Sequence, residues 1–289
     1  MSIWYSIIET LFPFQWAQYD FMKNALLGIL LVSPMFGILG TMVVNNKMAF
    51  FSDALGHSAL TGIAIGVMLG LDNELLSMLG FAIILSIAII KVKNARTASV
   101  DTIISVFSSG AVALGIVILS YNGGFNKYST FLIGDLLSIS VTDINMLLCS
   151  FIAVIIIWCV WFNKFLLVSI NNTFAKSRGI NVKLFEYMFT ILVAIIVTIS
   201  IQWVGILVIS AMMILPAAAA RNISKNVKEY HIYSTGISII SGVLGLGISY
   251  IFGCATGATI VLISSLSFFI TYCVNILGNK KYKTRPQKV

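Results

Sequence analysis

Long apolar runs alternate with short polar breaks along the chain. Nine of the runs approach the length of about twenty residues that a helix needs to cross roughly 30 Å of hydrocarbon. They cover residues 24–45, 49–70, 75–92, 100–121, 142–163, 184–202, 204–219, 232–251 and 256–277. The seventh run is the shortest and its boundary with the sixth is weak, so eight spans is the alternative count. The pattern predicts an all-α polytopic membrane protein with about nine transmembrane helices.

Two further stretches are apolar but do not suit a span. Residues 128–140 are too few and too polar to cross the membrane, so they indicate a re-entrant or interfacial segment. Within it, Asp135 could assist ion entry or simply be hydrated at a turn. Residues 1–20 hold no Lys or Arg and several aromatic side chains, which is typical of an interfacial segment rather than a cleaved signal peptide.

Composition and charge fix the environment and the orientation. With 59% hydrophobic and 10% charged residues and a mean hydropathy of +1.00, the chain cannot be a water-soluble globule. All but two of the 18 Lys and Arg residues, Lys23 and Lys127, fall in turns on one side of the predicted spans or in the tail 279–289. Short cytoplasmic loops retain such charges, so the amino end is predicted outside and the carboxyl end inside. The net charge of +8 therefore suits an anionic inner leaflet and does not indicate nucleic-acid binding.

The second apolar run contains an aspartate and a histidine, in the sequence FFSDALGHSAL. Asp53 and His57, at positions i and i+4, lie about 6 Å apart along a helix axis and roughly 40° apart around it, so they share a face. Ionisable groups at membrane depth face a protein interior or a water-filled path and find a partner. One hypothesis is that the two side chains only satisfy each other. The other is that carboxylate oxygen and imidazole nitrogen together bind a divalent transition metal.

The same run carries three glycines at a spacing of four residues. Gly62, Gly66 and Gly70 form a G-x-x-x-G-x-x-x-G pattern, which permits close approach of a neighbouring helix. Gly62 and Gly66 lie roughly 140 to 180° around the helix from the polar face. The sequence therefore predicts a helix that packs on one side and lines a path on the other.

Other candidate chemistry is sparse. The four cysteines show no C-x-x-C pairing and are expected to be small apolar packing residues. No G-x-x-x-x-G-K-[ST] phosphate-binding loop occurs in the sequence, so the chain has no recognisable means of binding ATP and is not expected to be an enzyme. No linker or soluble domain interrupts residues 1–289, which are expected to form a single integral-membrane domain.

Two separated segments carry a resemblance to a known family. GILGTMVVNNKMAFFSDALGHSALTGIAIG resembles the early segment of permease subunits of metal-ion ABC importers of the zinc/manganese/iron family, with its S-D-x-x-x-H-x-x-L-x-G motif. VGILVISAMMILPAAAA resembles the second hallmark of that family, and GATIVLIS resembles its last span. The similarity extends from about residue 20 to residue 277.

The resemblance implies a vitamin B12 permease-like bundle in a bacterial cell membrane. Two permease chains would pair as a homodimer, two cytoplasmic ATP-binding subunits would dock beneath them, and an extracytoplasmic metal-binding protein would deliver the ion. Asp53 and His57 would hold the passing ion, with no permanently bound cofactor. The loop with Ala175, Lys176 and Gly179 would meet the ATPase, although a solvated basic loop that only enforces topology is the alternative.

The metal and the class of transporter leave alternatives open. Branch similarity favours zinc, with manganese or iron as alternatives, because a carboxylate and an imidazole do not separate these ions. An ion-coupled secondary metal transporter is the second hypothesis; an internal inverted repeat would favour it, and none is evident. An intramembrane metalloenzyme ordinarily needs three protein ligands, and only two good ones are apparent.

Overall fold

The computed structural model describes residues 4, 5, 8, 18–71, 73–95, 98–121, 134 and 136–283. The long helices are α2 (Asp20–Asn45), α3 (Phe51–Met68), α4 (Glu74–Asn94), α5 (Val100–Tyr121), α8 (Val141–Ile170), α10 (Val182–Val204), α11 (Ile206–Ile223), α12 (Val227–Phe252) and α13 (Thr256–Lys283). The short elements are η2 (Leu136–Ser138), a 3-10 turn, and α9 (Asn172–Ser177).

Each predicted span corresponds to one long helix of the described chain. Eight of these helices are long and apolar enough to cross a membrane by length and composition. The ninth, α3, has 18 residues, as many as α11, but it includes polar residues such as Asp53 and His57. The prediction of an all-α, multi-span membrane protein is therefore confirmed.

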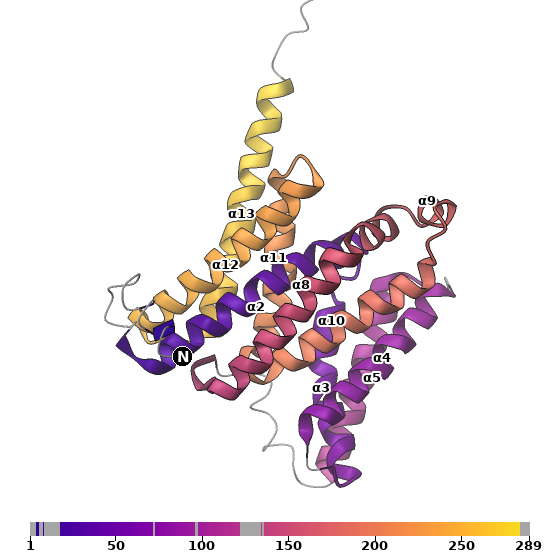
Figure 1. The fold of residues 1–289 in the computed structure, drawn as a ribbon, viewed down its shortest axis with the longest axis vertical. Coiled ribbons are helices and arrows are strands. Elements are labelled where there is room, and N and C mark those ends of the chain that lie inside the picture. The colour runs from indigo at the N-terminus through magenta and orange to yellow at the C-terminus, as the bar shows by residue number, and fades with distance from the viewer. Residues whose placement is uncertain are drawn as a thin grey trace, which may run out of the picture.

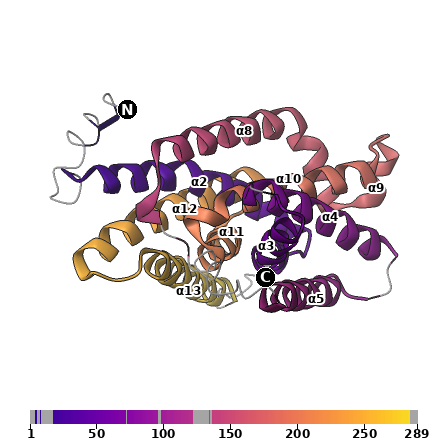
Figure 2. The same ribbon diagram turned by 90° about the horizontal axis from the view of Figure 1, so that it is seen from below.

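The helices form a layered bundle (Figure 1). Figure 2 shows α8 along one face and α13 and α5 along the opposite face, with α2, α10 and α11 between them. In the most apolar 18-residue stretch of α2, 72% of the residues are buried, whereas in that of α13 only 11% are buried. The outer helices therefore present apolar side chains outward, as lipid contact requires, and α2 forms the centre of the packing.

Most of the basic turns lie together at one end of the bundle. His231 at the start of α12 has its Nε2 atom 2.9 Å from the hydroxyl oxygen of Thr41 near the end of α2. At the same end, the Lys93 ammonium of α4 lies 3.6 Å from a carboxylate oxygen of Glu186 on α10. This end, called the basic end below, also holds the turn between α2 and α3, the segment around α9 and the turn between α11 and α12 (Figure 1). These segments carry Lys47, Lys176, Arg178, Lys183, Arg221, Lys225 and Lys228. The positive-inside rule predicts that this end faces the cytoplasm.

Small residues and hydroxyl groups join α2 to α12. Ser234 donates a hydrogen bond of 2.6 Å to the carbonyl of Gly37, and Ser238 donates one of 2.9 Å to the carbonyl of Ser33. A Cβ atom at Gly37 would lie only 2.7 Å from the Cα atom of Thr235. The two backbones thus approach closely, which is the usual solution for helices that have no hydrophobic driving force between them in lipid.

The glycines of α3 serve two different purposes. A Cβ atom at Gly62 would lie 2.8 Å from the Cα atom of Met78, and one at Gly66 would overlap the side chain of Ser77, so both glycines allow α4 to approach. Gly70 does not belong to this contact. It lies beyond the end of α3 with φ +70°, and the amide of Leu71 donates to the carbonyl of Gly66, which closes the helix in a Schellman motif.

The two segments predicted as interfacial fall largely outside the described residues. Of residues 1–17 only Trp4, Tyr5 and Ile8 are described; the Tyr5 hydroxyl donates to Asn24 of α2 at 2.8 Å, and Ile8 is buried. Residues 122–133 and Asp135 lie outside the described chain, so the re-entrant segment at 128–140 stays a prediction.

The close contact between α3 and α4 can be tested by Gly62→Leu. The added side chain meets backbone atoms of Met78, so we expect a loss of about 1–3 kcal/mol of stability, as in other overpacked cores. The yield of monodisperse protein after detergent extraction and its thermal midpoint should both fall. Gly80→Leu is the matched control, because nothing lies within 4 Å of a Cβ atom there. Equal behaviour of the two variants would show that α3 and α4 do not pack in this way.

Candidate metal site

The start of α3 brings Asp53 and His57 together. The helix begins at Phe51, so Asp53 lies in its first turn and His57 one turn further on. The Oδ1 atom of Asp53 and the Nε2 atom of His57 are 3.5 Å apart, and each side chain is 44% exposed. The two groups share a face as their spacing predicts, and that face is open.

The facing helix α11 adds a third polar group. The Ser210 hydroxyl donates a hydrogen bond of 3.4 Å to Asp53 Oδ1. A Cβ atom at Gly56 would lie 3.2 Å from the Ile206 Cβ atom, and closer still to a methyl carbon of that side chain, so the absent side chain lets α11 approach α3. Nothing in the sequence paired Ser210 with Asp53; a single hydroxyl inside an otherwise apolar span was the only signal.

An open groove runs between α3 and α11. It has a volume of about 550 Å³ and is lined by Phe50, Asp53, His57, Ile206, Leu207, Ser210, Ala211, Ile214 and Leu215. Apart from the three polar side chains its walls are apolar. In Figure 2, α3 and α11 lie between α5 and α13. The carboxylate and the imidazole therefore lie on an exposed and otherwise apolar surface, not in a closed core.

The donor set suits an ion that is held briefly. Carboxylate oxygen and imidazole nitrogen are ligands for divalent first-row metals. Within the described part of the chain, no group of three or more His, Cys, Asp or Glu side chains could enclose a metal. A site with two protein donors and open positions can accept an ion from one side and release it to the other, as passage requires.

The predicted ATPase-contact loop forms a short capped helix at the basic end. The Asn171 side chain accepts hydrogen bonds from the amides of Thr173 and Phe174 and so begins α9. At the other end Gly179 has φ +74°, and its amide donates to the carbonyl of Lys176 at 2.9 Å, as in a Schellman motif.

The three residues predicted in this loop differ in exposure. Lys176 and Gly179 are exposed, whereas Ala175 is fully buried and helps to anchor α9. Two residues that the sequence did not single out extend the exposed surface. Phe174 is 46% exposed, and the Arg178 guanidinium lies 5.3 Å from the centre of its ring.

The long apolar helices define a multi-span membrane protein, and its sequence and fold match those of membrane transport subunits. The ABC 3 transport family matches residues 18–275. The manganese transport system membrane protein MntC of Listeria monocytogenes is 30% identical over 255 residues, which cover 88% of this chain and 91% of that protein. The high-affinity zinc uptake system membrane protein ZnuB of Haemophilus influenzae is 29% identical over 254 residues, covering 88% and 97%.

A solved structure has the same fold. PsaBC from Streptococcus pneumoniae, in complex with Fab, superposes with a TM-score of 0.77 at 27% identity, covering 94% of this chain and 95% of that one. The chain belongs to the ABC 3 transport family and is a membrane permease of a metal-ion ABC importer.

Proposed function

We propose that the chain passes a divalent transition metal ion from an extracytoplasmic metal-binding protein to the cytoplasm. The observation that carries this proposal is the open Asp53–His57 pair in the wall of a groove between two membrane helices. A carboxylate on such a face is costly against lipid, so it needs a protein partner or a water-filled path. The relatives named for manganese and zinc transport support a metal ion as the cargo of this pair.

A second copy of the chain is the proposed cover for the groove. Two copies related by a two-fold axis would bring their α3–α11 walls face to face, since a closed dimer uses the same surface on both partners. Each pair would then face the other across one path, and the donors would rise from two to four. The apolar lining would meet its counterpart, and neither carboxylate would face hydrocarbon.

The proposed cargo is Mn²⁺ or Zn²⁺. The relatives include proteins named for each of these ions, at 30% and 29% identity, which does not separate them. One carboxylate and one imidazole also serve both ions, because geometry and availability decide more than ligand type. The preference for zinc therefore stays a prediction from branch similarity, and uptake of each ion in competition with the other is the measurement that decides it.

The driving force is proposed to come from two separate ATP-binding subunits at the basic end. The sequence has no phosphate-binding loop of its own, and α9 offers an exposed, capped docking element there. The positive charges of this end predict that it is cytoplasmic, with the amino end of the chain outside. Residues 1–289 would then act as one permease domain in the inner membrane.

The proposed metal-binding role of Asp53 and His57, called the metal pair below, is tested by Asp53→Asn and His57→Ala. Asparagine keeps the shape of the side chain but removes the negative charge that stabilises a cation in a low-dielectric path, and alanine removes the nitrogen donor. We expect both variants to insert and to bind the ATPase, and uptake of radiolabelled manganese and zinc to be lost.

Asp101→Asn is the matched control, because Asp101 is an exposed carboxylate in the first turn of α5. Cells should express all four proteins in equal amounts. Wild-type uptake in both the Asp53 and the His57 variants would assign the pair a structural role only.

Ser210→Ala tests whether the hydroxyl of α11 positions the carboxylate. Hydrogen-bond partners of metal ligands typically contribute 10- to 100-fold to affinity, so we expect the KM for metal uptake to rise about tenfold. Ser210→Thr, which keeps the hydroxyl, should recover most of the loss. Ser86→Ala removes a buried hydroxyl that donates to its own helix and is the control. An unchanged KM in Ser210→Ala would show that Ser210 does not position the Asp53 carboxylate.

Gly179→Val tests the docking element. At φ +74° a β-branched residue costs roughly 1–2 kcal/mol, so the end of α9 should lose its shape although nothing crowds the position. We expect the variant to insert normally but to retain less ATPase during purification and to transport less metal. Gly179→Asn is the control, since asparagine tolerates this conformation. Normal co-purification and uptake in the valine variant would contradict the assignment.

A further inference from the structure

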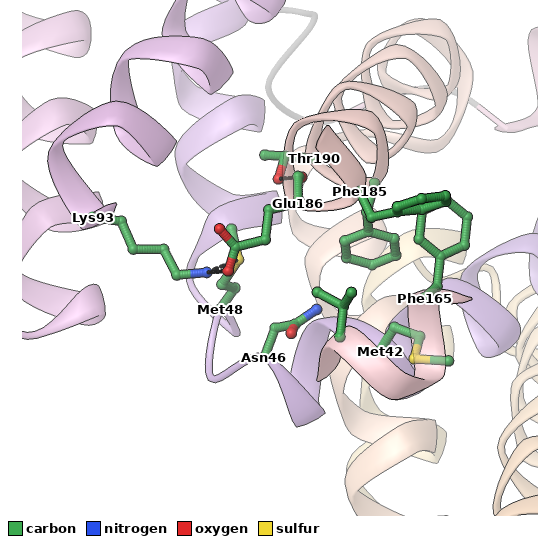
Figure 3. Close-up of a pocket in the computed structure, with 10 residues that line it drawn as sticks. Met42, Asn46, Met48, Lys93, Phe165, Phe185, Glu186 and Thr190 are labelled. Carbon is green, nitrogen blue, oxygen red and sulfur yellow. Dashed lines mark hydrogen bonds and ion pairs between the residues drawn. The ribbon is translucent and has the colours of Figure 1, made fainter. Parts of the chain in front are cut away.

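Two opposite charges meet in a partly buried position at the basic end. Lys93 lies in the last turn of α4, and Glu186 lies near the start of α10. The Nζ and Oε1 atoms are 3.6 Å apart, and the side chains are only 16% and 10% exposed. Figure 3 shows the two side chains pointing toward each other from their separate helices. A partly buried pair of this kind joins two elements, here α4 and α10, through charged groups.

The same ammonium group reaches a third element. Lys93 Nζ lies 3.9 Å from the sulfur of Met48, which is buried in the turn between α2 and α3 (Figure 3). The carbonyl of Met48 accepts a hydrogen bond of 3.0 Å from the amide of Phe51, the first residue of α3. Met48 is therefore fixed to the same helical turn that carries Asp53.

The turn that holds Met48 has a backbone conformation that its sequence does not favour. Lys47 has φ 55° in the left-handed region, at a helix end where glycine is the usual residue. The amide of Lys47 donates to the carbonyl of Val44 at 3.1 Å, and that of Met48 donates to the carbonyl of Val43 at 3.0 Å. These are the two hydrogen bonds of a Schellman motif, so the end of α2 itself closes this turn and places Met48 directly after it.

The start of α10 packs against the end of α8, next to the proposed docking helix α9. Phe185, next to Glu186, packs against Phe165 of α8 with ring centres 5.6 Å apart and against Trp161 at 6.4 Å. The short α9 lies between α8 and α10 in the chain and contacts both of them. The end of α8, α9 and the start of α10 thus form one packed unit, and Glu186 is the charged group through which it meets Lys93.

We propose that Lys93 and Glu186 are positioning residues for transport. The pair ties the unit around α9 to the turn that sets the start of α3, so that displacement of α9 reaches Asp53 and His57. This inference rests on the proposed function, because it requires the metal pair on α3 and an ATPase at α9. The Lys93 ammonium group contacts both the Glu186 carboxylate and the Met48 sulfur, so we expect the link to depend on its charge.

A purely structural ion pair makes a different prediction. Two apolar residues of similar volume often replace a buried ion pair without loss of stability, whereas removal of one partner leaves an uncompensated charge. K93M/E186M therefore separates folding from coupling, because it keeps the packing and removes the charges. The reversed pair K93E/E186K restores the charges with their positions exchanged. K91M is the matched control, since Lys91 is an exposed lysine in the same turn of α4.

The experiment uses the complete importer in proteoliposomes, with its ATPase and its metal-binding protein, and measures ATP hydrolysis and metal uptake separately. For K93M/E186M we expect a wild-type thermal midpoint, near-normal hydrolysis and a loss of about tenfold in metal ions transported per ATP, the scale of energetic coupling between distant sites. K93E/E186K should recover most of this ratio, and K91M should leave it unchanged.

Wild-type transport per ATP in K93M/E186M would overturn the inference and leave the pair a structural role. Asp53→Asn, measured in the same vesicles, distinguishes that result from failure of the proposed function. If Asp53→Asn abolishes uptake while K93M/E186M transports normally, only the coupling inference fails. If Asp53→Asn transports normally, the proposed role of Asp53 and His57 as metal ligands is wrong.

Discussion

Hydrocarbon offers no hydrogen bonds, so a membrane helix must satisfy its polar groups with partners from the protein. Along the contact of α2 with α12, serine hydroxyls donate to backbone carbonyls of the facing helix. Between α3 and α5, the Thr61 hydroxyl donates to the carbonyl of Ala111. Against this background the half-exposed Asp53 and His57 differ from the rest of the bundle. Under this constraint an open carboxylate among membrane helices needs a further partner or water, which supports the proposed path.

The positions of the helices could be predicted from the sequence, but their ends could not. Apolar length reports the thickness of the membrane, so every predicted span matches a helix. Several helices continue past the predicted spans: α8 extends to Ile170, beyond the predicted residue 163, and α12 begins at Val227 instead of residue 232. Side-chain caps decide these ends, since Asn226 accepts a hydrogen bond from the amide of Glu229. Hydropathy does not register such caps.

The candidate site could be predicted only as far as its groups are neighbours in sequence. Asp53 and His57 share one turn of helix, so their spacing was enough. Ser210 comes from another helix, as does Glu186 opposite Lys93, and no periodicity links such distant positions. Glycine spacing has a similar limit. Gly66 and Gly70 continue one pattern, yet the first admits a neighbouring helix and the second ends its own.

The short helix α9 shows what its two caps provide. Six residues are too few for a helix to persist alone in water, but Asn171 closes one end and Gly179 the other, while Ala175 is buried beneath it. Its shape is therefore set by this chain before any partner arrives. A protein that binds a preorganised element loses little conformational entropy in ordering it. A force applied to α9 would therefore move it as a rigid body, because local unfolding would absorb little of the displacement.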